Sequence, residues 1–194
     1  MTVSTADQDL PRCAWAGNDP EYRRYHDEEW GVPLHGDQAL FEKISLEAFQ
    51  AGLSWITILR RRAAFRTAFH QFDIERVASM DDTEVEQLMA DTAIIRNRAK
   101  ILATRSNARI ALALTEHSPG ALDDLVWAAR PKKIRPRPAA AWEVPATTPE
   151  SEALSTTLRA LGFRFVGPTT MYALMQSAGV VDDHVEGCWR ARPV

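Results

Sequence analysis

The stretch DQALFEKISLEAFQAGLSW, residues 37–55, predicts the fold class most directly. Its apolar residues recur at a helical spacing of about 3.6 residues. They are Leu40, Phe41, Ile44, Ala48 and Ala51. Asp37 is a suitable N-cap and Gly52 a suitable stop signal. The stretch therefore predicts one long helix with an apolar face.

Helical periodicity returns along most of the chain, and no alternation of apolar and polar residues is long enough to predict a sheet. Further helices are expected over 54–69, from about 73, from about 82, over 95–114, up to about 127, over 151–161 and over 169–178. The proline-rich stretch RPKKIRPRPAAAWEVPATTPE, residues 130–150, predicts a long surface connection. The expected fold class is all-α.

The composition is that of an ordinary globular protein. The chain has 194 residues, 45% hydrophobic and 25% charged, which suits one compact unit or two small lobes. The net charge of −3 gives no global attraction to nucleic acid, so an anionic partner would need a local basic patch. No segment approaches about 18 consecutive apolar residues, and the N-terminal segment is polar and acidic. We therefore expect neither a membrane span nor a secretory signal, but a cytoplasmic protein with reduced cysteines.

Two pairs of cysteine and histidine lie near opposite ends of the chain. Cys13 precedes His26, and His184 precedes Cys188 by four residues, a spacing that suits one helical turn or one tight loop. Two thiols and two imidazoles are the donor set of a closed structural zinc site. Because the spacing matches no zinc-finger pattern, unrelated buried thiols and surface histidines are the alternative. A catalytic zinc ion is less favoured, because it needs an open coordination position.

Glu47 interrupts the apolar face of the helix predicted from Asp37 to the stop at Gly52. It lies three residues after Ile44 and four before Ala51, so its carboxylate is expected among apolar neighbours. The ordinary interpretation is a carboxylate at the edge of that face, paired or reaching solvent. The first third of the chain is also rich in aromatic side chains, namely Trp15, Tyr22, Tyr25, Trp30 and Trp55. These rings predict either a hydrophobic core or, around a buried acid, a pocket for a flat polar or cationic ring.

The stretch IIRNRAKI, residues 94–101, follows MADTA and has the outline of a helix end, a tight turn and the start of a basic helix. Such a turn can present backbone N–H groups to phosphates, together with Arg96, Arg98 and Lys100. The alternative is an ordinary solvated helix start.

Five ordered segments carry a resemblance to a known family. They are RCAWAGNDPEYRRYHDEEWGVP (12–33), LFEKISLEAFQAGLSWITILRRR (40–62), AIIRNRAKI (93–101), GFRFVG (162–167) and DDHVEGC (182–188). Through them the chain resembles the constitutive, Tag-type 3-methyladenine DNA glycosylase I of bacterial base-excision repair, from Cys13 to Cys188. Residues 13–188 are the expected helical glycosylase domain. Residues 1–12, an extension expected to be disordered, and the short tail 189–194 fall outside the resemblance.

The resemblance implies a helix-hairpin-helix fold and one structural zinc ion joining the ends of the chain. The implied zinc ligands are Cys13, His26, His184 and Cys188. It also implies a monomeric, monofunctional enzyme of the bacterial cytoplasm that acts at the nucleoid. Such an enzyme flips 3-methyladenine out of double-stranded alkylated DNA and hydrolyses the N-glycosidic bond, leaving an abasic site.

Residue roles follow from the same resemblance. Glu47 and Tyr25 are the expected catalytic residues, which recognise the base. The expected lining of the base pocket is Trp15, Tyr22, Trp30 and Trp55. The expected DNA contacts are Leu53, Ala93, Arg96, Arg98 and Lys100. Leu53 stands beside Gly52 at a helix junction, where an apolar side chain can fill the gap left by the flipped base.

The chain departs from the family pattern at Ala93, where the hairpin turn usually has glycine. If that position needs positive φ, alanine costs about 1 kcal/mol or more, and the hairpin either binds DNA slightly less well or takes a slightly different turn. Residues 94–114 also contain no acidic side chain, whereas other helix-hairpin-helix glycosylases use an aspartate to support the sugar cation. That absence fits a labile, cationic base.

Two other classes of function are considered. A non-catalytic, zinc-stabilised DNA-damage-binding protein would keep the zinc and the hairpin but lose the pocket acid, whereas this chain has Glu47 and Tyr25. A zinc hydrolase of small molecules would need an open metal position, which four protein ligands deny.

Overall fold

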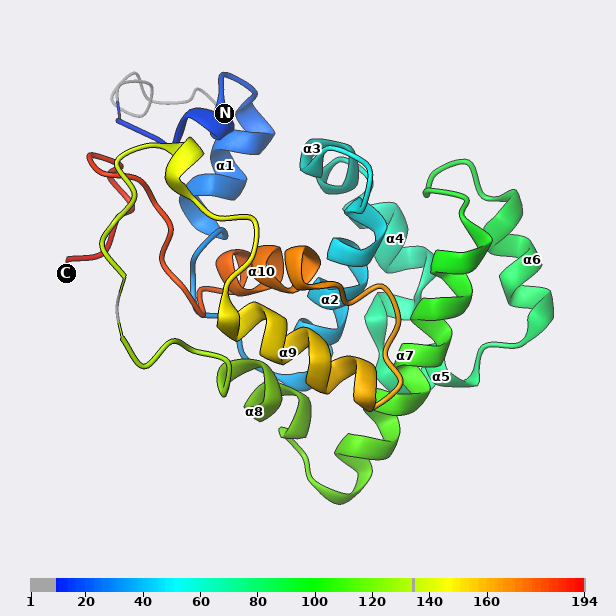
Figure 1. Cartoon of the computed structure of the whole chain (residues 1–194). Helices are drawn as coiled ribbons and strands as arrows, with labels where there is room; N and C mark the ends of the chain where they lie inside the picture. The colour runs from blue at the N-terminus through cyan, green and yellow to red at the C-terminus, as the bar shows by residue number, and fades with distance from the viewer. Residues whose placement is uncertain (1–9, 134, 194) are drawn as a thin grey trace.

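The structure, a computed structural model, describes residues 10–133 and 135–193. All regular elements in those ranges are helical and none is a strand, which confirms the all-α prediction (Figure 1). The elements are η2 (Ala14–Ala16), α1 (Pro20–Glu28), α2 (Asp37–Gln50), α3 (Trp55–Leu59), α4 (Arg62–Ala68), η3 (His70–Phe72), α5 (Ile74–Ser79), α6 (Asp82–Ala90), α7 (Arg98–His117), α8 (Ala121–Trp127), η4 (Ala141–Glu143), α9 (Pro149–Ala160) and α10 (Pro168–Ser177). In the described ranges, no helix is long and apolar enough to cross a membrane.

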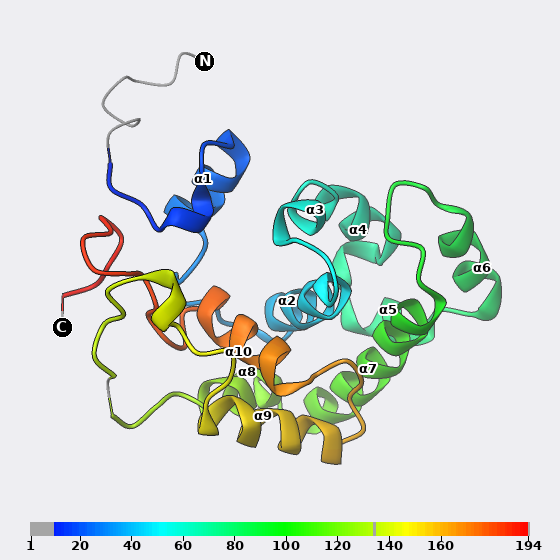
Figure 2. The same cartoon turned by 45° about the horizontal axis from the view of Figure 1, so that its top comes forward.

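Helix α2 lies at the centre of the molecule and packs against α3, α7, α8 and α10 (Figures 1 and 2). Most of its predicted apolar face is buried, with Leu40, Phe41 and Ile44 inaccessible to solvent, whereas Ala51 follows the end of the helix and is exposed. Phe49 of α2 and Phe65 of α4 pack with ring centroids 4.7 Å apart. A helix buried on most of its surface gives its few polar side chains fixed neighbours, which is how α2 positions the functional site.

Asp37 acts at the start of a different helix from the one expected. Gly36, with φ 98°, is the N-cap of α2, and Asp37 is the first residue of the helix. The Asp37 carboxylate instead accepts hydrogen bonds from the N–H groups of Gly120, Leu122 and Asp123, at 2.7, 3.0 and 3.0 Å. It therefore caps α8 and ties the start of α2 to the start of that helix.

Other helix boundaries differ from the expected ones for local reasons. The helix expected over 54–69 is two helices, α3 and α4, interrupted at Arg60 and Arg61. Helix α7 begins at Arg98 because the Asn97 side chain accepts from the N–H of Lys100 and so caps it. Helix α1 was not expected, although Asp19 followed by proline is a regular start signal.

The two ends of the described chain lie side by side. The N–H of Trp189 donates to the carbonyl of Pro11 at 2.9 Å, and the indole N–H of Trp189 donates to Asp27 at 3.1 Å. Arg12 also pairs with Asp27, at 2.6 Å, and its side chain is only 8% exposed. Arg12, at the end of the segment expected to be a disordered extension, thus has a defined partner, and residues 1–9 lie outside the described ranges.

Helix α10 meets the loop after α1 at a glycine. A Cβ on Gly179, which has φ +71°, would lie 2.7 Å from backbone atoms of Gly31, Val32 and Pro33. Because backbone cannot yield as a flexible side chain can, only glycine permits this approach. The approach holds the C-terminal end of α10 against the segment that carries Trp30.

Candidate functional site

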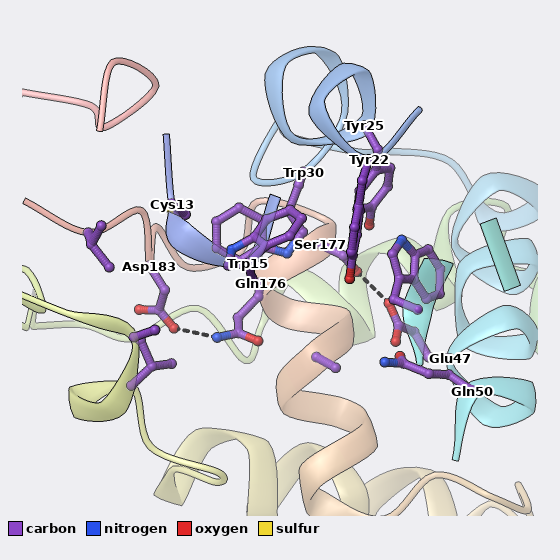
Figure 3. A pocket seen from close by; sticks show the side chains of 15 residues that line it. Cys13, Trp15, Tyr22, Tyr25, Trp30, Glu47, Gln50, Gln176, Ser177 and Asp183 are labelled. Carbon is purple, nitrogen blue, oxygen red and sulfur yellow. Dashed lines mark hydrogen bonds between the residues drawn. The ribbon is translucent and has the colours of Figure 1, made fainter. Parts of the chain in front are cut away.

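A cavity of about 240 Å³ opens between α1, α2, α10 and η4. All five aromatic side chains expected around Glu47 line it: Trp15, Tyr22, Tyr25, Trp30 and Trp55. Figure 3 shows Trp15 and Trp30 over the end of α10, with Glu47 to one side. The structure thus brings the predicted acid and the predicted rings into one pocket. Which of them contact a ligand stays a prediction.

The aromatic walls form one continuous set of ring contacts. Trp15 lies with its ring centroid 5.1 Å from that of Tyr22 and 5.1 Å from that of Trp30. Tyr25 joins Trp15 to Trp55, with centroid separations of 6.3 and 5.4 Å. Spacings in this range are favourable for ring pairs and fix the walls in place. A flat ring would therefore enter a pocket whose faces are already formed.

Glu47 is buried, with 4% of its surface exposed. One carboxylate oxygen, Oε1, accepts a hydrogen bond from the Ser177 hydroxyl at 2.8 Å. Within the described ranges, Oε2 has no hydrogen-bond partner. Burial raises the pKa of Glu47 above 4.5, while the charge of Lys43 and the Ser177 hydrogen bond lower it. The carboxylate is therefore a positioned acceptor with capacity left for a ligand.

The neighbouring Trp55 carries an unused donor. Its indole Nε1 is buried and has no hydrogen-bond partner in the described part of the chain. An unpaired buried N–H is unfavourable and is usually satisfied by water or a ligand. Because this N–H is inaccessible to solvent, it offers no donor at the surface of the pocket.

The opposite side of the pocket has polar residues that sequence reasoning missed. The Gln176 side-chain amide donates to Asp183 Oδ2 at 2.9 Å (Figure 3). The hydroxyl of Tyr172 donates to the same oxygen. Gln176 and Ser177 are consecutive at the end of α10, so one helix end fixes both polar sides of the pocket. Ser177 lies 130 residues from Glu47, and no local pattern predicts that pair.

The four expected metal ligands form one buried cluster beside the pocket. The cluster consists of Cys13, His26, His184 and Cys188, and its potential ligand atoms all lie within 4.8 Å of one another. Cys13 Sγ lies 3.6 Å from His184 Nδ1, and Cys188 Sγ lies 3.4 Å from both His184 Nδ1 and His26 Nε2. Tetrahedral zinc with ordinary bond lengths separates sulfur and nitrogen ligands by roughly 3.5 Å. The cluster can hold a metal ion.

The surroundings of the two histidines suit this role. His26 Nδ1 lies 2.8 Å from Asp27 Oδ1, and His184 Nε2 lies 3.3 Å from the carbonyl of Trp30. These contacts leave His26 Nε2 and His184 Nδ1 facing the thiols, as outer partners of metal ligands commonly do. Burial lowers the pKa of His184 to about 4 and also lowers that of His26, so both rings are neutral and able to ligate.

The hairpin between α6 and α7 is exposed and held from one side by Arg61. The Arg61 guanidinium donates to the carbonyls of Thr92 and Ala93, at 3.2 and 2.9 Å. Asp91 accepts from the N–H of Ala93 at 2.8 Å. Ala93 does not have positive φ, so the conditional cost of alanine in this turn does not arise. Sequence reasoning had not singled out Arg61 as a support of the turn.

The three basic residues expected to contact DNA lie in different surroundings. Arg96 is exposed. Arg98 is exposed and makes two hydrogen bonds to the Glu86 carboxylate, at 2.5 and 2.7 Å. Lys100 points inward, where its ammonium donates to the carbonyls of Phe49 and Ala51 at 2.9 and 2.8 Å. Lys100 thus departs from the expected phosphate contact, because its ammonium holds the end of α2.

Leu53, the residue expected to fill the gap in DNA, lies in the connection between α2 and α3. It is 42% exposed, which is unusual for a leucine beside a buried helix. Its exposure is compatible with the expected role and leaves that role a prediction.

Comparison with known proteins places this site in a family. The model of the family described as methyladenine glycosylase matches residues 15–191. The chain is 46% identical over 180 residues to DNA-3-methyladenine glycosylase 1 of Escherichia coli (strain K12), covering 92% of this chain and 96% of the relative.

Solved structures agree. A crystal structure of 3-methyladenine DNA glycosylase I (TAG) matches with a TM-score of 0.89 and 45% identity, covering 94% of this chain and all of the other. A variant of 3-methyladenine DNA glycosylase I in complex with 3-methyladenine matches with a TM-score of 0.87 and 32% identity, covering 94% of this chain and 98% of the other. The chain therefore belongs to the methyladenine glycosylase family.

Proposed function

We propose that this protein is a monofunctional DNA glycosylase that flips 3-methyladenine out of alkylated double-stranded DNA. It then hydrolyses the N-glycosidic bond and leaves an abasic site. The observation that carries the proposal is the buried Glu47 carboxylate, with one oxygen free for a ligand, in a pocket of five aromatic side chains. The names of the 46% identical relative and of the matching structures support the same substrate.

The chemistry suits this pocket. Methylation at N3 makes adenine cationic in DNA, so the base leaves as a neutral molecule and needs little acid catalysis. The nucleotide must instead leave the stack, at a cost of about a few kcal/mol, and be held where water can attack the sugar. We assign Glu47 as the acceptor for the adenine amino group and Tyr25 as a second polar contact. The aromatic walls stack on the base.

For DNA binding we propose that α6, the turn after it and α7 form a helix-hairpin-helix motif. The turn around Ala93, with Arg96 and Arg98, contacts phosphates. Leu53 fills the gap left by the flipped base. The 13–188 domain acts as a monomer on chromosomal DNA in the cytoplasm.

We further propose that the cluster of Cys13, His26, His184 and Cys188 binds one structural zinc ion. The matching donor separations, the neutral imidazoles and the outer partners of both histidines support this assignment. A bound zinc ion would supply a closed cross-link between the two ends of the chain and no reactive position.

The direct test is release of free base from duplex DNA that carries 3-methyladenine. We expect free 3-methyladenine and an alkali-labile abasic site from the wild type and much less from Glu47→Ala. Tight binding to damaged DNA without release would instead support the non-catalytic damage-binding protein. A protein that neither binds the damaged DNA nor releases the base would refute both functions.

A further inference from the structure

Behind the aromatic walls of the pocket lies a buried lysine. Lys43 precedes Glu47 by four residues on α2 and is only 8% exposed. Its ammonium donates a hydrogen bond to the Tyr25 hydroxyl oxygen at 2.9 Å. The ammonium nitrogen also lies 4.9 Å from the ring centroids of both Tyr25 and Trp55. In the described part of the chain, no carboxylate lies within ion-pair distance of it.

This contact determines which way the Tyr25 hydroxyl proton points. An ammonium has only donor protons and no lone pair, so the Tyr25 oxygen must be the acceptor in their hydrogen bond. The hydroxyl proton of Tyr25 has no other partner among the described residues. Because Tyr25 lines the pocket, the free direction for that proton is toward a ligand.

We propose that Lys43 is a positioning residue that turns the Tyr25 hydroxyl proton into the pocket, so that Tyr25 can only donate a hydrogen bond to the base while Glu47 accepts one. The amino group of adenine is flanked by ring nitrogens that accept hydrogen bonds, so the base presents a donor beside an acceptor. A pocket with one fixed acceptor and one fixed donor matches that edge. This inference rests on the proposed function and names how the same site reads its base.

The charge of Lys43 also keeps Glu47 in its role as a hydrogen-bond acceptor. The titratable groups that face Glu47 are Lys43 from α2, and Tyr22 and Tyr25 from α1; α10 contributes the neutral Ser177. Burial raises the pKa of Glu47 and Lys43 opposes that rise. The lysine therefore favours the ionised carboxylate, which can only accept.

The charged groups around Lys43 affect its own protonation. Burial lowers the pKa of Lys43, whereas Glu47, Glu29 and Glu42 raise it and Arg62 lowers it. Glu29 also forms a bidentate pair with Arg62. The carboxylates favour the ammonium form on which the donor role depends.

A double-mutant cycle on free 3-methyladenine tests the inference. Lys43→Met, Tyr25→Phe and the double variant are compared with wild type by titration calorimetry. The pH is set well above the pKa of Glu47, so that its carboxylate is ionised in every variant. We expect Lys43→Met to weaken binding of the neutral base about tenfold, and to weaken it less than twofold when Tyr25 is already Phe. Equal weakening in both backgrounds, or no weakening in either, would overturn the inference.

Two further readouts separate this role from a structural one. Lys43→Met replaces a buried ammonium by an apolar side chain, so the melting temperature should not fall. The acid limb of base excision should move to higher pH, because the charge that favours ionised Glu47 is gone. Wild type that neither binds nor excises 3-methyladenine would reject the proposed function itself. An active wild type whose acid limb and affinity are unchanged by Lys43→Met rejects only the role of Lys43.

Discussion

The base pocket and the hairpin surface hold their charged side chains in opposite surroundings. In the pocket, Glu47 is 4% exposed and Lys43 is 8% exposed, and each has a defined hydrogen-bond partner. On the hairpin, the side chain of Arg98 is 48% exposed and that of its partner Glu86 is 61% exposed. Buried charges interact strongly because little water screens them, whereas exposed charges are screened by water and salt.

The difference suggests two kinds of recognition in one molecule. In the proposed function, the pocket distinguishes one base edge from another, because moving or removing any one group leaves another unpaired. The proposed partners of the hairpin are phosphates, which carry no sequence information and tolerate small displacements. Substitutions in the pocket should therefore act on base identity and pH dependence, and those on the hairpin on salt dependence.

The largest effect is expected from disrupting the proposed zinc site, whose four residues lie beside the pocket. Cys188→Ala should abolish zinc binding and lower the melting temperature by roughly 10 °C or more, as about 4 kcal/mol would in a chain of this size. Metal analysis and thermal unfolding measure both. Because the cluster is remote from α6 and α7, hydrogen exchange of the hairpin amides should change little. If the wild-type protein purified without zinc and its melting temperature did not change with a chelator, the assignment of the zinc site would be contradicted.

Loss of the pocket acid should have the next largest effect. Glu47→Ala should lower 3-methyladenine excision by about 10- to 100-fold, since a hydrogen bond to a charged group contributes about 1.5–3 kcal/mol. In wild type, activity should fall as pH drops through the raised pKa of Glu47, so the acid limb lies above pH 4.5. Glu47→Gln should retain part of the activity and lack this limb.

Affinity for free 3-methyladenine separates base recognition from general-base catalysis by Glu47. Recognition predicts that Glu47→Gln loses affinity in parallel with excision. If excision vanished while the affinity for free base stayed the same, Glu47 would act on water or the sugar.

Removing the Ser177 hydroxyl, which donates to Glu47, should lower excision less than removing Glu47 itself. Ser177→Ala deletes the hydrogen bond to Glu47 Oε1 and should lower excision about tenfold. Ser155→Ala is a matched control, because Ser155 is also buried and its hydroxyl donates to the carbonyl of Val166. The two variants should lose similar stability, and only Ser177→Ala should lose activity. Equal activities in the two variants would mean that Ser177 does not position the acid.

These pocket contacts differ in how far sequence could predict them. The burial of Glu47 follows from helical spacing within α2, whereas the buried Lys43, four residues earlier on the same helix, was not singled out from the sequence. The contacts of Asp37 with α8 and of Ser177 with Glu47 join residues 83 to 86 and 130 positions apart, respectively. Local periodicity cannot specify such pairs, because they depend on how helices pack.

Family resemblance supplied what spacing left open. The cysteine and histidine pairs alone were compatible with unrelated residues, and the structure brings all four together. Resemblance was less informative on the hairpin. It grouped Lys100 with the phosphate contacts, whereas this lysine is 7% exposed and bonded to the end of α2. Helical spacing places Lys100 on the same face of α7 as the buried Thr104 and Asn107, but it does not identify the carbonyls at the end of α2 as partners of its ammonium.

The hairpin prediction concerns salt dependence. Arg98→Ala should weaken DNA binding a few-fold and reduce the slope of log affinity against log salt by about 1. Glu86→Ala removes the carboxylate that Arg98 contacts, so it should strengthen binding at low salt. Fluorescence anisotropy over a salt series measures both. An unchanged slope in Arg98→Ala would remove Arg98 from the interface, and affinity for free base should not change in either variant.

The smallest effect is expected from Ala93→Gly, which asks whether the turn itself limits DNA binding. Ala93 does not have positive φ, and its N–H and carbonyl are already held by Asp91 and Arg61. Glycine therefore relieves no strain and only adds freedom to the unfolded chain, which lowers stability by about 0.5–1 kcal/mol. Affinity for DNA should stay within about twofold of wild type. A clear gain in affinity would show that the DNA-bound turn adopts positive φ at this position, and the hairpin would then be a surface that changes shape on binding while the pocket does not.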